Sequence, residues 1–124
     1  AERVRARRRV TPRSRVRRGR PPARLRERRV LSAQATTVVD DERLRITTWR
    51  FETSGDSTGW HVHEHDYVVV PITGGTFAVT APDGTTRELA QEAAVSYLGT
   101  AGTEHDVVYV GDTPAAFVEI ELKR

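Results

Sequence analysis

The chain has 124 residues, a formal net charge of +3 and no cysteine. Without cysteine it has no disulfide framework, no thiol nucleophile and no thiolate-bound zinc, so any metal must use nitrogen and oxygen ligands. No stretch approaches the roughly 18 to 20 apolar residues of a membrane-spanning helix, and we expect a soluble, cytoplasmic protein that does not bind membranes.

The charge is divided unevenly along the chain. Residues 1–30 contain 14 arginines against two glutamates, whereas residues 31–124 contain 6 basic and 15 acidic side chains. The whole-chain charge therefore describes neither part, and it does not by itself indicate a nucleic-acid partner. Residues 31–124 are enough for one hydrophobic core, so we expect a single domain there.

The arginine-rich segment 1–30 isolates its few apolar residues among charges and contains three prolines. Such a segment cannot bury an apolar face, so we expect it to be disordered. The simplest interpretation is that translation was assigned to start too far upstream. Arms of this composition also bind nucleic acid or resemble organelle transit peptides, and these alternatives stay open.

From residue 31 onward, short runs rich in β-branched and aromatic residues are separated by turn residues. This pattern is typical of strands, and a spacing of about ten residues is typical of a sandwich or barrel. We therefore predict an all-β domain over residues 31–124, with strands at 36–40, 43–52, 59–63, 67–72, 76–81, 86–89, 94–98, 105–110 and 115–122.

Three of these strands also predict which side chains are buried. On 43–52, Trp49 and Phe51 lie on one face, and we expect this aromatic pair in the core. The apolar run 68–70 indicates a strand covered on both faces, by a second subunit on one of them, so we expect a homodimer. Glu119 and Glu121 alternate with apolar residues, and we interpret them as a solvated face.

Three histidines have the spacing of a metal site. His61 and His63 point to the same side of a strand because side chains alternate, and His105 lies on a later strand. Neutral imidazole is a common ligand of Zn, Fe, Cu and Ni. His65 would join them only if alternation continued, so we interpret it as a turn histidine. Asp66 would become a ligand only if the turn brought it inward, so we interpret it as a turn cap. The alternative is a barrel whose histidines bond only each other or water.

The spacing Gly55-x5-His61-x-His63-x3-Tyr67-x6-Gly74, followed by Gly102-x2-His105, resembles the two motifs of the cupin superfamily. Those motifs read G-x5-HxH-x3,4-E-x6-G and G-x5-PxG-x2-H-x3-N. Tyr67 stands at the glutamate position of the first, and Ala94, Thr100 and Tyr109 replace the glycine, proline and asparagine of the second. Residues 58–75 and 117–122 also look like small bacterial cupins, including some from β-alanine degradation.

The resemblance implies a jelly-roll barrel, or double-stranded β-helix, with one divalent transition metal (Fe, Zn, Mn, Ni or Cu) on His61, His63 and His105. Three imidazoles would leave coordination positions open. Tyr67 would ligate weakly or orient a substrate through its hydroxyl, and Trp60 would help to shape the pocket. Two functions stay open. One is a metal-dependent oxidoreductase or isomerase acting on a small oxygen-bearing metabolite, and the other is a non-catalytic small-ligand sensor.

Overall fold

The computed structural model describes residues 6–7, 9–10 and 33–124 of the chain. The N-terminal residues among these form two short antiparallel strands, β1 (Ala6–Arg7) and β2 (Arg9–Val10). The disorder predicted for the rest of 1–30 lies outside the described residues. In the part that the structure describes, no helix is long and apolar enough to cross a membrane.

Residues 33–124 form nine strands and no helix. Each strand overlaps one of the predicted strands, which confirms the all-β fold class. In chain order they are β3 (Gln34–Asp40), β4 (Leu44–Phe51), β5 (His61–Val62), β6 (Asp66–Pro71), β7 (Gly75–Thr80), β8 (Thr86–Gln91), β9 (Tyr97–Gly99), β10 (Glu104–Tyr109) and β11 (Ala115–Leu122).

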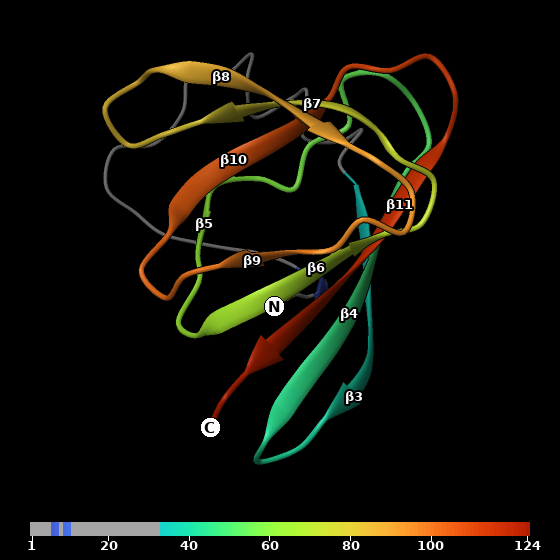
Figure 1. The fold of residues 1–124 in the computed structure, drawn as a ribbon. Helices are drawn as coiled ribbons and strands as arrows, with labels where there is room; N and C mark the ends of the chain where they lie inside the picture. The colour runs from blue at the N-terminus through green and yellow to red at the C-terminus, as the bar shows by residue number, and fades with distance from the viewer. Residues whose placement is uncertain (1–5, 8, 11–32) are drawn as a thin grey trace.

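The nine strands make two antiparallel sheets that face each other (Figure 1). One sheet has the order β5-β10-β7-β8 and the other the order β3-β4-β11-β6-β9. Because strands far apart in sequence are neighbours in both sheets, the chain crosses repeatedly between them. This is the predicted jelly-roll barrel, a double-stranded β-helix with its interior between the sheets.

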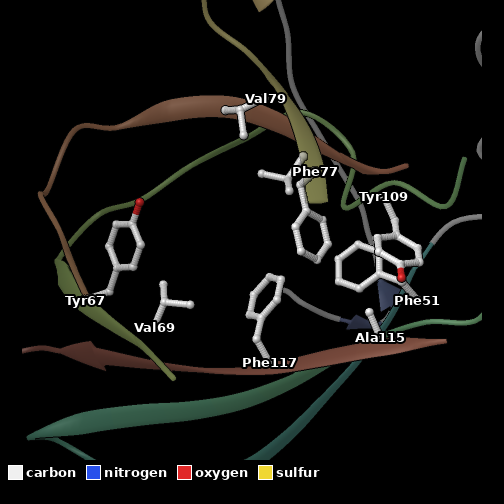
Figure 2. Close-up of a cluster of buried hydrophobic side chains, with 9 residues drawn as sticks. Phe51, Tyr67, Val69, Phe77, Val79, Tyr109, Ala115 and Phe117 are labelled. Carbon is white, nitrogen blue, oxygen red and sulfur yellow. The ribbon is translucent and has the colours of Figure 1, made fainter. Parts of the chain in front are cut away.

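The core lies between the sheets and is dominated by aromatic rings. Phe51 and Phe77 are fully buried, and their ring centroids lie 5.1 Å apart in an edge-to-face arrangement. Tyr109 and Phe117 pack against the same pair. Trp49 is partly buried beside this cluster, which confirms the prediction for strand 43–52. Figure 2 shows that Tyr67 and Val69 lie apart from the four rings, toward the other end of the barrel.

Two turns show why the resembled motifs contain glycine. Gly55 and Gly102 adopt φ angles of 97° and 91°, in the left-handed region that side chains disfavour. Ala94 stands at a motif glycine and adopts φ 69°, which makes it the one non-glycine residue of the described chain with a positive φ. The turn therefore keeps its conformation without glycine, at a cost of roughly 1–2 kcal/mol.

The apolar run 68–70 is covered mainly on one face. Val69 points into the core and is 3% exposed, whereas Val68 and Val70 lie half-buried on the outer face of their sheet. Cover by a second subunit, and hence the homodimer, stays a prediction.

Candidate functional site

Two adjacent strands bring the three histidines together. His61 begins β5, and its direct cross-strand partner is His105 in β10. His63 follows β5, and two backbone hydrogen bonds hold it against the neighbouring loop: its N–H donates to the Thr103 carbonyl at 2.8 Å, and its carbonyl accepts from Gly102 N–H at 2.7 Å. The loop thus fixes the position of the most buried histidine of the group, which is 4% exposed.

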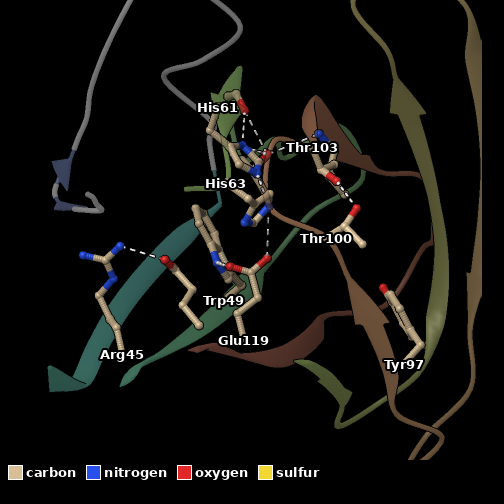
Figure 3. Close-up of polar contacts among 12 residues, drawn as sticks. Arg45, Trp49, His61, His63, Tyr97, Thr100, Thr103 and Glu119 are labelled. Carbon is tan, nitrogen blue, oxygen red and sulfur yellow. Dashed lines mark hydrogen bonds and ion pairs between the residues drawn. The ribbon is translucent and has the colours of Figure 1, made fainter. Parts of the chain in front are cut away.

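The separation of the imidazole nitrogens suits one metal ion after a small adjustment. One ligand nitrogen from each of His61, His63 and His105 lies within 4.8 Å of the others, and the Nε2 atoms of His61 and His63 are 3.1 Å apart (Figure 3). Two nitrogens on one ion are about 3.0 to 3.4 Å apart, given metal–nitrogen bonds of about 2.0 to 2.1 Å. The His61–His63 pair already has this separation, and the His105 nitrogen would have to move closer to both before it could share the ion.

The hydrogen bonds of His61 select its tautomer. Its Nδ1 lies 2.8 Å from the Gly59 carbonyl, which can only accept. Nδ1 is also 3.3 Å from the Thr58 hydroxyl, which itself donates to the same carbonyl at 3.0 Å. Nδ1 therefore carries the proton, and the Nε2 lone pair faces His63. A bond of this kind from the remote nitrogen orients a metal-binding imidazole.

Burial keeps the other two imidazoles neutral. Desolvation, with repulsion from His61 and His105, lowers the pKa of His63 well below its ordinary value of 6.5. Desolvation and the charge of His61 lower the pKa of His105 to about 3. Neutral imidazole is the form that binds metal ions, so this group is prepared for a cation at neutral pH.

Glu119 corrects the interpretation of the last strand as a solvated face. It is 8% exposed, its Oε1 accepts a hydrogen bond from Trp49 Nε1 at 3.3 Å, and its Oε2 lies 3.9 Å from His63 Nε2 (Figure 3). Glu121 is also mostly covered and forms a 2.7 Å ion pair with Arg45. The signal that could have revealed this is Phe117, because residues two apart on a strand share one face.

Tyr67 lies beside His63. The two rings stack with centroids 3.8 Å apart and planes inclined by 14°. Burial, with repulsion from Glu119, raises the pKa of Tyr67 to about 12, so its hydroxyl is protonated and can donate a hydrogen bond. The ring occupies this position because Gly99, its cross-strand partner, has no side chain. A Cβ there would lie 2.0 Å from Tyr67 Cζ.

The remaining candidates lie outside the histidine group. His65 is half-buried beside Glu64, with 4.0 Å between Nε2 and Oε1, and Asp66 Oδ1 accepts a hydrogen bond from Ala101 N–H at 2.8 Å. The Trp60 indole donates a hydrogen bond to Glu104 Oε2 at 2.6 Å, and Trp60 is not among the described residues that line the adjoining cavity.

A cavity of about 310 Å³ adjoins the histidine group. Its apolar walls come from both sheets and include Val69, Val79, Leu89, Val107 and Phe117. His105, Glu119 and Tyr67 line it together with Arg87, Gln91 and Tyr97. Sequence reasoning missed these last three residues. The cavity has the volume of roughly ten water molecules, which is at the lower end of the range of small-molecule pockets.

Gln91 adds a polar feature to the cavity wall. Its Nε2 donates to the Tyr97 hydroxyl at 2.9 Å, while its buried Oε1 has no hydrogen-bond partner among the described residues. A buried acceptor without a partner costs about 1–3 kcal/mol. Buried polar atoms without a partner are uncommon, so the wall beside Tyr97 offers an acceptor that a water molecule or a polar ligand would satisfy.

Glu119 predicts an unusual pH dependence for the metal-free protein. Burial and repulsion from Glu121 raise its pKa from 4.5 to about 8. Because the folded protein holds this proton more tightly than the unfolded chain does, protonated Glu119 contributes to the free energy of unfolding at low pH. This contribution is lost as the pH rises through 8. His63 and His105 act oppositely, but only below about 6.5.

We therefore expect the free energy of unfolding to fall between pH 6.5 and 8, by up to about 2 kcal/mol for one proton. Urea denaturation of the metal-free protein at both pH values measures this change. Glu119→Gln, which keeps the shape but cannot ionise, should abolish the decrease. An equal decrease in both proteins would assign it to another group.

Comparison with known proteins identifies the family. No protein-family model matches the chain. The β-alanine degradation protein BauB of Pseudomonas aeruginosa is 42% identical over 91 residues, which cover 73% of this chain and 94% of BauB. The crystal structure of a cupin domain from Bordetella pertussis is 43% identical with a TM-score of 0.71, and the match covers 75% of this chain and 95% of that domain.

A more distant structure supports the fold alone. An RmlC-like cupin with a double-stranded β-helix fold from Methanocaldococcus jannaschii is 11% identical with a TM-score of 0.61, and the match covers 74% of this chain and 81% of that one. With two relatives above 40% identity that are covered almost completely, and with the motif histidines gathered inside a jelly-roll barrel, this chain belongs to the cupin superfamily.

Proposed function

We propose that this protein is a small metal-binding cupin in which His61, His63 and His105 hold one divalent transition metal beside the cavity. The observation that carries the proposal is the convergence of three imidazole nitrogens within 4.8 Å. Two of these rings are kept neutral by burial, and the third is oriented by a backbone carbonyl. Imidazole donors suit Fe, Mn, Ni, Cu or Zn rather than Ca or Mg.

Glu119 is proposed to supply the carboxylate that position 67 lacks. The resembled motif has a glutamate where this chain has Tyr67, and Glu119 reaches the same group of histidines from β11 instead. Because Trp49 donates to its Oε1, the other oxygen is the one directed at His63. Because Glu119 holds a proton at neutral pH in the metal-free protein, metal binding would have to release that proton before this oxygen could ligate the ion or accept a proton from a bound molecule.

Tyr67 is proposed as the residue that orients the substrate. Its phenol lines the cavity, and stacking on His63 fixes the ring. Its protonated hydroxyl would donate a hydrogen bond to an oxygen of the bound molecule, while the apolar walls exclude water from it. When bound, the metal would supply a Lewis acid that polarises such an oxygen or a centre for dioxygen chemistry.

The presence of Glu119 and Tyr67 beside the histidines favours an enzyme over a non-catalytic sensor, because both residues offer proton-transfer or orienting groups at the same place. We propose an oxidoreductase or isomerase that acts on a small oxygen-bearing metabolite. The Pseudomonas relative is named for β-alanine degradation, so compounds of that degradation are the first substrates to assay.

Metal removal tests the proposal. We expect the full chain, purified without a polyhistidine tag, to contain close to one transition-metal ion per chain by elemental mass spectrometry, and to lose its activity on such a compound after chelation. Restoring the metal should restore activity. A protein that contains no metal, even after reconstitution, would contradict the proposal, and ligand binding that persists unchanged after chelation would favour the sensor.

A further inference from the structure

Arg87 is a charged residue of the cavity to which the proposed chemistry assigns no role. It lies on the edge strand β8, where it is exposed to solvent at the rim of the cavity that it lines, and none of the described carboxylates forms an ion pair with it. By contrast, Arg45 and Arg50 in β4 have carboxylate partners at 2.7 Å and 3.2 Å. An arginine that faces a cavity without a carboxylate partner is placed to bind an anion from outside the chain.

The register of the sheet places Arg87 at a defined distance from the histidines. Arg87 in β8 pairs with Val79 in β7, and Val79 pairs with Val107 in β10. Both valines are buried in the core. Because residues paired across a sheet share one face, Arg87 lies on the inward-facing side of β8. His105 lies two residues before Val107, on the same face of β10.

The register therefore gives an approximate distance between the backbone positions of Arg87 and His105, which a ligand contacting both residues would have to span. The two outer strands of three neighbours are roughly 10 Å apart, and two residues along a strand add roughly 7 Å. The Arg87 side chain covers part of that span, since it reaches into the cavity that His105 also lines.

The cavity also limits the kind of anion. Arg87 is the one lysine or arginine among the lining residues that the structure describes, and much of the remaining wall is apolar. A single guanidinium matches a single negative charge, and its planar fork fits a carboxylate through two parallel hydrogen bonds.

We propose that Arg87 binds the carboxylate of a small monoanionic ligand whose other end reaches the histidine group. The proposal rests on the proposed function, in that the cavity is the ligand site. It adds the substrate class, a short-chain carboxylate with an oxygen at the far end, and it assigns to Arg87 the role of a specificity-determining residue.

Isothermal titration calorimetry with the Zn²⁺-loaded full chain tests this inference. The probes are ω-hydroxycarboxylates from glycolate to 5-hydroxypentanoate, each compared with its uncharged primary amide. We expect at least one carboxylate to bind more tightly than its amide, and Arg87→Gln to weaken its binding roughly ten- to a hundredfold while leaving the amide unchanged. Arg87→Lys, which keeps the charge but loses the fork, should retain part of the affinity.

The control is Arg50→Gln, which removes an exposed arginine on the outer face of β4. This variant should bind each carboxylate and each amide with the affinity of the parent. Equal binding of the carboxylates to the parent and to Arg87→Gln would overturn the inference, as would a series in which no carboxylate binds better than its amide. The metal content of the same samples separates the two proposals: Arg87-dependent binding without retained metal would overturn the metal site and support the carboxylate site.

Discussion

Replacing His105 with alanine is expected to weaken the binding of a divalent transition metal by at least roughly a hundredfold. His105 is one of the three residues whose ligand atoms converge, and its ring is held opposite His61 by the pairing of β10 with β5. Removing it leaves only two imidazole ligands for the ion, which hold it less tightly than three. Competition against a chromophoric chelator measures the affinity of each variant.

His65→Ala is the matched control for this experiment. His65 belongs to the same sequence cluster but lies beside Glu64, outside the converging group. Its replacement should leave metal affinity within about twofold of the parent, since its described partner is Glu64 on the turn and not one of the three histidines that it could orient. The account would be wrong if His65→Ala lost metal while His105→Ala retained it, because the ligands would then include the turn histidine.

Replacing Gly99 with alanine is expected to destabilise the fold and disturb the site together. An added Cβ would lie 2.0 Å from Tyr67 Cζ and 2.4 Å from both neighbouring ring carbons, so the ring must leave its present position. Overpacking of this kind costs about 1–3 kcal/mol. Because the ring stacks on His63, its displacement should also weaken metal binding. Urea denaturation and the same chelator competition measure the two effects.

Gly111→Ala separates the two effects. A Cβ at Gly111 would lie 2.2 Å from the Tyr109 hydroxyl, which donates to the Thr113 carbonyl in the aromatic part of the core. We expect a similar loss of stability with unchanged metal affinity. If Gly111→Ala weakened metal binding as much as Gly99→Ala, the effect would reflect general destabilisation rather than the contact between Tyr67 and His63.

The strands and the histidine group could be predicted from the sequence because both depend on local spacing. Alternation places His61 and His63 on one side of a strand, and the turn residues mark the strand ends. Ala94 illustrates the same point, since it stands at a motif glycine and takes the positive φ that the turn requires. The motif spacing survives even where the residue type has changed.

The rest of the site could not be predicted because it depends on pairing between distant strands. From the sequence, Glu119 is predicted to be a solvated residue between apolar neighbours. Only the register of β11 against β4 and β6 places it beside Trp49 and His63. Arg87 likewise appears in a polar strand whose inward side is defined by its partner Val79. Local patterns do not carry this information, since either face of such a strand could be buried.

The most direct test of the metal centre is a crystal structure of the metal-loaded protein, with diffraction data collected at the absorption edge of the bound element. We predict one anomalous peak about 2.0 to 2.2 Å from an imidazole nitrogen of each of His61, His63 and His105. A peak placed elsewhere, or the absence of any peak from crystals of protein incubated with the metal, would contradict the assignment of these three residues as its ligands.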